Sequence, residues 1–366
     1  MNKQDWTYKK LGEVCEKASS NIAQNKIANL DGNYPVFGAS GFVQNVDFYH
    51  RDTPYIGIVK DGSGVGRVNI YPAYSSLLGT MQYIIPKNGC LLGYIAYVLK
   101  GLNLSSFASG AAIPHIYFKD YGKCTIPIPP LAEQERIVAE LDLLSGIIEK
   151  KKEQLKAYDQ LTQSIFYTMF GDPVTNEKGW NKSSLSKMGL LARGVSKHRP
   201  RNAPELLGGT MPLIQTGDVA NADFYIRNFT STYSELGVSQ SKIWKAGTLC
   251  ITIAATIGKC AILSFDACFP DSVVGFTVND KLCNNEYVFF IFKCLQSILE
   301  ENAPSVAQKN INLKVLNELE LPLPPLSLQQ EFAEKVESIE RQKALIRQSI
   351  DEVQTMFDYT MDKYFG

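Results

Sequence analysis

The chain has 366 residues, of which 45% are hydrophobic, so it can bury more than one core and is too apolar to be disordered. Its 37 Lys and Arg residues balance 37 Asp and Glu residues, and this neutral total does not by itself indicate a nucleic-acid binder. Residues 1–10 lack the apolar core of a signal peptide. The most apolar stretch, residues 248–265, is broken by Gly258 and Lys259, which favours two buried strands over a membrane helix. We therefore expect a cytoplasmic protein that does not contact membranes.

The first predicted segment, residues 1–125, is a globular module. It holds 12 Lys and Arg residues against 8 Asp and Glu residues, which makes it modestly basic. Residues 61–66 read DGSGVG, but Arg67 follows where a dinucleotide-binding fingerprint needs its last glycine. A tight turn between two strands is the better interpretation, and an apolar helix is expected at residues 91–99. We predict a mixed α/β fold with a short, twisted sheet.

Residues 126–171 combine a proline-rich element with a long helix. Residues 126–131 read IPIPPL, and the alternating prolines enforce an extended backbone that launches the helix at a fixed angle. Ile126 and Ile128 indicate a strand docked on the module. A charged helix is expected at about residues 131–169, and Asp172-Pro173 ends it. The apolar residues at its heptad a/d positions are Ile137, Leu141, Leu144, Ile148, Leu155, Tyr158, Ile165 and Met169.

The third segment, residues 172–320, repeats the first module loosely. Residues 180–185 (WNKSSL) correspond to residues 6–11 (WTYKKL), and residues 211–215 (MPLIQ) correspond to residues 34–38 (YPVFG). Residues 257–259 (IGK) match residues 65–67 (VGR), and an apolar helix at residues 287–299 matches the one at 91–99. The framework recurs while the loops differ, so we expect a second mixed α/β module with a short, twisted sheet.

The last segment, residues 321–366, repeats residues 126–171 at an offset of 195 without a gap. Residues 321–326 read LPLPPL, and a helix is expected at about residues 326–365. The apolar a/d residues of this helix are Phe332, Val336, Ile339, Ile346, Ile350, Val353, Phe357 and Tyr364. Two such helices bury their stripes most simply against each other, in an antiparallel pair with pseudo-twofold symmetry. The alternative, in which each helix packs only on its own module, is disfavoured because 39 helical residues span about 58 Å.

The sequence carries no recognisable catalytic constellation. The eight cysteines include no C-x-x-C pair and no Cys/His cluster with zinc spacing, so we interpret them as reduced core residues. His50, His115 and His198 are far apart in the sequence, and the Asp/Asn-Pro-Pro-aromatic tetrapeptide of amino-methyltransferases is absent. We therefore predict a protein that is not an enzyme and binds no metal or cofactor itself.

Several basic and polar positions are candidates for DNA contact. The densest basic run is KHRPR at residues 197–201, and two matched loops, residues 109–115 and 305–310, precede the proline-rich elements. Side chains of these types bind phosphates or base edges. The predicted DNA-binding residues are Lys60, Arg67, Ser109, His115, Lys197, Arg199, Arg201, Lys242, Lys259, Gln308, Lys309 and Asn310.

On these residues the chain resembles the specificity subunit of a Type I restriction–modification system. The resemblance rests on the repeated PxPPL with its following glutamine, which is Gln134 in the first copy and Gln329 in the second. It implies an α+β protein with two target recognition domains, residues 1–125 and 172–320, each followed by a proline-rich element and a spacer helix, residues 126–171 and 321–366. The helices would form an antiparallel coiled coil and hold partner subunits.

The resemblance also implies the function. Each domain would read one half of a bipartite, asymmetric site in double-stranded DNA. Two modification subunits with S-adenosylmethionine would methylate adenine, and restriction subunits with ATP and Mg²⁺ would translocate and cleave DNA. Two alternatives remain: the specificity subunit of a related fused nuclease–methyltransferase system, and a coiled-coil adaptor that binds only proteins.

Overall fold

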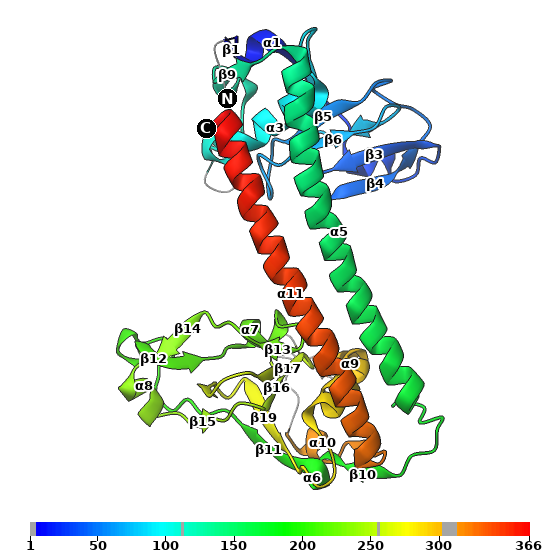
Figure 1. Ribbon diagram of the computed structural model, residues 1–366, viewed down its shortest axis with the longest axis vertical. Coiled ribbons are helices and arrows are strands. Elements are labelled where there is room, and N and C mark those ends of the chain that lie inside the picture. Colours follow the sequence, from blue (N-terminus) through cyan, green and yellow to red (C-terminus); the bar gives the residue numbers. More distant parts are fainter. Residues whose placement is uncertain (1–4, 111–112, 255–256, 302–312) are drawn as a thin grey trace. The chain divides into compact units, whose positions relative to one another are not determined.

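The computed structural model describes residues 5–110, 113–254, 257–301 and 313–366. The chain divides into two compact units (Figure 1). The first unit comprises Met1–Glu153 with Arg347–Gly366, and the second unit comprises Gln154–Ile346. Each long helix therefore belongs partly to one unit and partly to the other.

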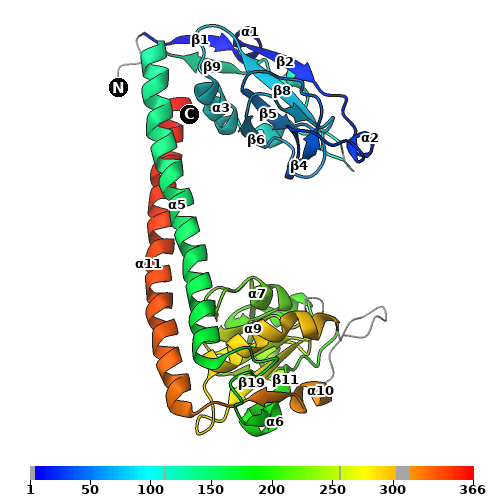
Figure 2. The same cartoon turned by 90° about the vertical axis from the view of Figure 1, so that its right-hand side faces the viewer.

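The first unit contains three antiparallel or mixed sheets. A two-stranded sheet pairs β1 with β9, a four-stranded antiparallel sheet has the order β2-β8-β5-β6, and a three-stranded sheet has the order β4-β3-β7. The helix α3 packs on β5, β6 and β8 (Figure 2). The elements of the module are β1 (Thr7–Lys10), α1 (Leu11–Val14), β2 (Cys15–Ser19), α2 (Gln24–Ile27), β3 (Tyr34–Gly38), β4 (Gly41–Val46), β5 (Tyr55–Val59), β6 (Val68–Tyr71), β7 (Ser76–Leu77), β8 (Met81–Pro86), α3 (Leu92–Gly101), η1 (Leu104–Phe107), α4 (Phe118–Tyr121) and β9 (Thr125–Ile128).

The second unit repeats this plan with one extra strand in each larger sheet. β10 pairs with β20, a five-stranded sheet has the order β11-β19-β16-β17-β13, and a four-stranded sheet has the order β14-β12-β18-β15. The elements of the module are β10 (Lys182–Ser184), α6 (Leu185–Met188), β11 (Gly189–Arg193), η2 (Pro204–Leu206), β12 (Leu207–Leu213), α7 (Thr216–Ala220), β13 (Tyr225–Ile226), β14 (Ser231–Tyr233), α8 (Glu235–Ser239), β15 (Ile243–Trp244), β16 (Leu249–Thr252), β17 (Cys260–Leu263), β18 (Ala267–Cys268), β19 (Val273–Val278), α9 (Asn285–Glu301), α10 (Leu313–Asn317) and β20 (Glu320–Pro322).

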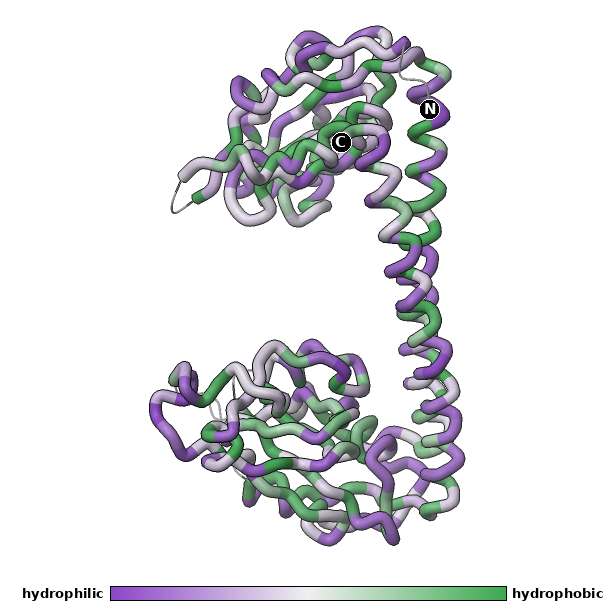
Figure 3. The backbone as a smooth tube through the Cα atoms, turned by 60° about the vertical axis from the view of Figure 1, so that its left-hand side comes forward, coloured by the Kyte–Doolittle hydropathy of each residue, from purple (hydrophilic) through white to green (hydrophobic). Residues whose placement is uncertain are grey.

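The strands at the centre of each larger sheet are those with continuous runs of apolar residues. β5 (YIGIV) and β16 (LCIT) are buried along their whole length, and β16 with β17 forms the two buried strands predicted in residues 248–265. Figure 3 shows hydrophobic and hydrophilic residues alternating along the long helices. The expectation of a single short sheet per module was wrong. β3 pairs with the short strand β7, and β12 pairs with the short strand β18, so each module contains a second, separate sheet.

The proline-rich elements are structured joints between module and helix. The first residues of each element form a strand, as predicted. Ile126 in β9 and Leu321 in β20 are buried. The hydroxyl of Tyr94 in α3 donates to the carbonyl of Pro127 (2.9 Å), and the hydroxyl of Tyr287 in α9 donates to that of Pro322 (2.8 Å). The same hydrogen bond from a tyrosine to the proline-rich element therefore occurs in both units.

The glutamine that follows each PxPPL forms hydrogen bonds to the backbone at this joint. Gln134 is fully buried, donates to the carbonyls of Gly89 and Pro129 (both 2.9 Å) and accepts from the amide of Leu91 at the start of α3 (2.9 Å). Gln329 is likewise buried, donates to Leu282 and Pro324, and accepts from the amide of Asn284 (3.1 Å) before α9. Because an amide both donates and accepts, one side chain satisfies backbone groups on both sides of the joint.

The long helices are α5 (Leu131–Phe170) and α11 (Leu326–Phe365), within one residue of the predicted ranges. α5 ends at Gly171, whose positive φ of 76° is the left-handed conformation that commonly terminates helices. Phe166 and Phe170 at the end of α5 meet Phe332 near the start of α11 in the second unit, with ring centroids 5.6 and 5.3 Å apart.

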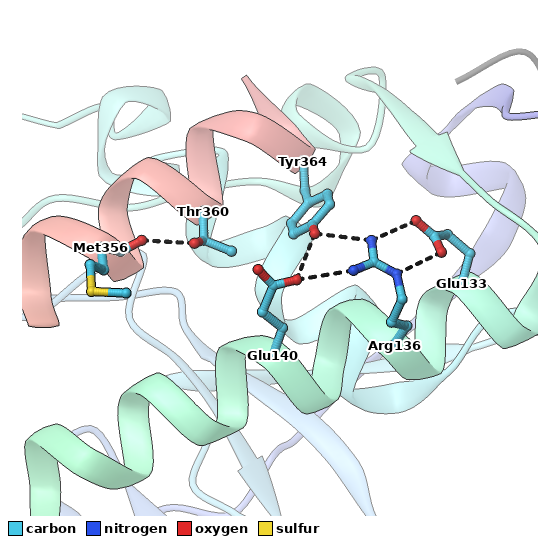
Figure 4. Close-up of polar contacts among 6 residues, drawn as sticks. All are labelled: Glu133, Arg136, Glu140, Met356, Thr360 and Tyr364. Atoms are coloured by element: carbon cyan, nitrogen blue, oxygen red, sulfur yellow. Dashed lines mark hydrogen bonds and ion pairs between the residues drawn. The ribbon is translucent and has the colours of Figure 1, made fainter. Parts of the chain in front are cut away.

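In the first unit, the beginning of α5 meets the end of α11 (Figure 4). The fully buried Tyr364 donates its hydroxyl hydrogen to Glu140 (2.6 Å) and accepts from Arg136 (3.0 Å). Glu133 also binds Arg136, and this hydrogen bond is the main cause that raises the arginine pKa. In the first unit the start of α5 contacts the end of α11, and in the second unit the end of α5 contacts the start of α11. The two helices therefore run antiparallel, as predicted.

The predicted heptad a/d residues are shielded from solvent, and two further residues of the long helices are buried. Every predicted a/d residue is buried or half-buried. Phe166 is buried although it lies outside the seam, because this end of α5 also packs on the module of the second unit. Lys343 is an unpredicted polar member of the seam: it is 3% exposed and its ammonium binds Asp159 of α5 (2.6 Å) and Glu340 (2.7 Å).

Candidate nucleic-acid interface

The turn between β5 and β6 carries two predicted contact residues, Lys60 and Arg67. The amide of Val59 donates to the carbonyl of Arg67 (3.0 Å) and the amide of Gly66 donates to that of Val59 (2.8 Å), which closes the predicted tight turn. Gly66 has a φ of 87°, and a Cβ there would lie 2.6 Å from the Ser105 amide nitrogen, so only glycine fits. Exposed Arg67 donates to the carbonyl of Ala39 (2.9 Å).

The loop that contains Ser109 and His115 lies against this turn. The two residues exchange backbone hydrogen bonds of 2.9 and 2.8 Å, and the amide of Ile116 donates to the carbonyl of Lys60 (3.0 Å). The His115 Nδ1 also contacts the Asp61 carboxylate, which lies 3.8 Å from the Lys60 ammonium. The structure thus brings Lys60, Ser109 and His115 together, and Lys60 and His115 both lie at the carboxylate of Asp61, which was not among the predicted contact residues.

The basic run of the second module is also ordered by acidic and amide partners. The backbone amides of Lys197 and His198 donate to the Gln240 side chain at 2.6 and 3.0 Å. Arg199 and Arg201 both reach Asp271, at 3.7 and 2.5 Å. Asp271 therefore holds the two guanidinium groups together at one edge of the module.

Lys242 lies beside this run. The hydroxyl of Ser241 donates to the carbonyl of Val195 (2.7 Å), and the Lys242 ammonium lies 3.7 Å from the ring centre of Trp244. Lys259 follows Gly258 in the β16–β17 turn, the place that Arg67 occupies in the first module. Among the described residues no hydrogen bond or ion pair joins Lys259 to the basic run. The predicted residues Gln308, Lys309 and Asn310 lie outside the described residues.

Each module also has a cleft that sequence reasoning missed. The first, of about 640 Å³, is lined by Asn21, Ile22, Ala23, Gln24, Gly38, Ala39, Ser40, Gly41, Phe42, Val43, Leu78, Gly79 and Thr80. The second, of about 170 Å³, is lined by Arg201, Asn202, Leu207, Leu213, Gln215, Thr216, Ser231, Tyr233, Pro270 and Ser272. Of the predicted contact residues that the structure describes, Arg201 alone lines one of these two clefts.

The residues predicted for the coiled coil and subunit dock lie inside the molecule. Ile137, Leu141, Leu144, Ile148, Phe332, Val336, Ile339 and Ile346 are buried, and Leu155 and Ile350 are half-buried. Such positions stabilise the helix pair but offer little surface to a partner. Two apolar side chains at matching repeat positions, Leu161 and Met356, are exposed instead.

The described residues contain no group of His, Cys, Asp and Glu that could hold a metal ion. All eight cysteines are free. Burial raises the pKa of Cys15, Cys260 and Cys283 to about 12, so these thiols stay protonated and are poor nucleophiles at neutral pH. Within the described ranges, no helix is both long and apolar enough to cross a membrane.

Comparison with known proteins gives a consistent result. The family described as Type I restriction modification DNA specificity domain matches residues 3–157 and 177–355. The chain is 22% identical over 376 residues to the Type I restriction enzyme EcoDI specificity subunit of Escherichia coli, covering 92% of this chain and 81% of that protein. It is 23% identical over 300 residues to the putative MjaX specificity subunit of Methanocaldococcus jannaschii, covering 75% of this chain and 68% of the relative.

Solved structures show the same fold. The crystal structure of a Type I restriction–modification S subunit from M. genitalium aligns with a TM-score of 0.62 at 16% identity, covering 99% of this chain and 96% of that one. A chain from a study of complex assembly and conformational transition of the type I R-M system aligns with a TM-score of 0.55 at 18% identity, covering 99% and 98%.

Proposed function

The chain belongs to the Type I restriction–modification DNA specificity family, and from this premise we propose that it is the non-catalytic, DNA-reading subunit of such a complex. Its two modules would each read one half of a bipartite, asymmetric target. The observation that carries the proposal is the repeated framework with unlike contact residues: Lys60, Ser109 and His115 cluster in the first module, whereas Arg199 and Arg201 converge on Asp271 in the second.

Chemistry would be supplied by partners. Modification subunits would bind S-adenosylmethionine and methylate adenine, and restriction subunits would use ATP and Mg²⁺ to translocate and cut DNA. The a/d residues stabilise the helix pair, so we assign the partner contact to the outward faces, with Leu161 and Met356 as anchors related by the 195-residue repeat. A pair of equivalent anchors suits two copies of one partner. The complex would act in the cytoplasm.

The direct test is a mobility-shift assay with a random DNA pool, with and without the modification subunit of the same system. We expect sequence-selective retention by the complex, and neither methylation nor cleavage by the purified chain alone. Methylation or cutting by the chain alone would refute the non-catalytic role. Retention of no DNA by the complex would favour a protein-only adaptor, and a single partner polypeptide that both methylates and cleaves would identify the fused system.

Replacing Arg67 with alanine should weaken DNA binding by the complex and reduce its salt dependence. One lost phosphate contact lowers the slope of log K against log salt by about 0.9. The slope is measured by titration at several salt concentrations. The control is Lys10→Ala, which removes one exposed charge from β1 in a different sheet and should leave the slope unchanged. Equal slopes for both variants would remove Arg67 from the interface.

Lengthening both long helices should lengthen the gap between the two half-sites. Duplicating residues 147–153 after Glu153 and residues 340–346 after Ile346 preserves the heptad and adds about 10.5 Å to each helix. The methylated motif should gain about three base pairs in its gap, at about 3.4 Å each, with both halves unchanged. Sequencing methylated adenines in cells that carry the variant complex measures this, and an unchanged gap would contradict the spacer role.

A further inference from the structure

The two clefts occupy the same place in the two modules. In each, one wall is the segment that precedes a short helix, α2 in the first module and η2 in the second. A second wall follows the central strand of the smaller sheet, β3 or β12, and a third follows its parallel partner, β7 or β18.

Strand register makes this correspondence residue by residue. In the first module Val36 of β3 pairs with Ser76 of β7, and in the second Leu213 of β12 pairs with Cys268 of β18. Two residues beyond these pairs lie Gly38 and Leu78 in one module, and Gln215 and Pro270 in the other; all four line their clefts. Four residues beyond Ser76 and Cys268 lie Thr80 and Ser272, which also line the clefts.

The first cleft is neutral and open. Among the described residues, none of those that line it is charged, and its polar groups are the amides of Asn21 and Gln24 with the hydroxyls of Ser40 and Thr80. Phe42 lies at its rim with 61% of its surface exposed. Glycine at position 38 adds no side chain, which helps to explain why this cleft is the larger.

The second cleft is smaller and carries a cation. Gln215, at the position of Gly38, adds a side chain that donates to Ser231 (3.3 Å), and its backbone amide donates to Asp218 (2.8 Å). Arg201 lines the cleft, and its guanidinium is held by Asp271 at 2.5 Å. Asn202 and Gln215 provide further hydrogen-bonding groups.

We propose that these matched clefts are the places where the two modules read base edges, and that their unlike linings set the unlike half-sites. This inference rests on the proposed DNA-binding function. Asn and Gln side chains pair bidentately with adenine, whereas Arg pairs bidentately with guanine, and an exposed Phe contacts the thymine methyl group. The first module therefore reads A·T pairs through Asn21, Gln24 and Phe42, and the second reads a G·C pair through Arg201. Arg67, bonded to Ala39 at the rim, contacts the neighbouring phosphate.

The test uses the full chain with its modification subunit and reads the methylated motif by sequencing genomic DNA. Gln24→Ala should relax the preference at an A·T position of one half-site about tenfold. Arg201→Ala should do the same at a G·C position of the other half-site. In both variants the gap and the untouched half should stay as in the parent.

Each module offers a control residue of the same chemical type. Asn25 is the next, exposed amide of α2 and does not line the cleft, and Lys187 is an exposed cation of α6 in the second module. Asn25→Ala and Lys187→Ala should leave the motif unchanged. The inference is overturned if Gln24→Ala and Arg201→Ala also methylate the parental motif with parental preference, or if either variant alters both halves equally.

A variant that no longer supports methylation is analysed by selecting bound DNA from a random pool. Loss of base preference in one half, with the other half retained, supports the inference, whereas loss in both halves counts against it. The parent complex separates this result from failure of the proposed function: a parent that selects no sequence refutes DNA reading altogether, while a selective parent with indifferent variants refutes only the clefts.

Discussion

Replacing Phe332 with alanine should lower the free energy of unfolding of the second unit by about 3–5 kcal/mol, the usual cost of removing a fully buried phenylalanine. Phe332 is fully buried, and its ring lies 5.3 Å from Phe170, 5.6 Å from Phe166 and 5.2 Å from Phe290 of α9. The ring thus joins α11, α5 and the module in one cluster, and its loss leaves a cavity that all three must line.

Urea denaturation of the full chain, followed by circular dichroism, measures the change. Leu345→Ala is the control, because Leu345 lies on the same helix with 60% of its surface exposed. It should change the free energy by less than about 0.5 kcal/mol. A loss below about 1 kcal/mol for Phe332→Ala would mean that the helix end is not anchored by this cluster.

Lys343→Met should lower the free energy of unfolding of the second unit by about 3 kcal/mol, near the lower end for breaking a buried ion pair. Methionine keeps the apolar stem of the side chain, so the loss comes from the charge. The buried Glu340 would lose the ammonium at 2.7 Å and keep Arg227 at 3.3 Å, and Asp159 of α5 would lose its partner across the helix pair.

A double variant separates charge from shape. Lys343→Met combined with Glu340→Gln removes the buried carboxylate that has lost the ammonium and should recover at least half of the loss. Lys335→Met is the control on the same helix: its exposed pair with Glu331 at 3.3 Å should contribute at most about 1 kcal/mol. Equal effects of Lys343→Met and Lys335→Met would contradict a stabilising role for the buried network.

The elements with a strong local signal were predictable from the sequence. PxPPL followed by a long heptad pattern fixes an extended joint and a helix within the segment itself, so both helices were located to within a residue. Lys343 could not be predicted as buried, because a lysine at an a/d position resembles an interruption of the seam. Its partner Asp159 lies 184 residues away, and only the antiparallel pairing brings the two together.

The candidate interface was predictable only in part, for a related reason. Clusters of basic residues are visible in a sequence, but Asp61 and Asp271, which organise them, are separated from them by up to 72 residues. The first cleft left no signal, since small and neutral residues such as Gly38 and Thr80 line it, and in the second cleft only Arg201 had been predicted as a contact residue. The similarity of residues 34–38 to residues 211–215 already matched Gly38 with Gln215. The pairing of β3 with β7 and of β12 with β18, which supplies a further wall of each cleft, could not be predicted from the sequence.

The first unit is built from two segments that are far apart in the sequence, and this affects how it folds during synthesis. Tyr364 and the neighbouring Phe357, Met361 and Phe365 pack in the same core as Trp6 and Ile137. The ribosome must therefore make all of Gln154–Ile346 before the residues that complete that core exist. At about 5–20 residues per second this takes roughly 10 to 40 seconds. During that interval the nascent first unit exposes the apolar face of α5, whereas the second unit is contiguous and can close its own core as it emerges.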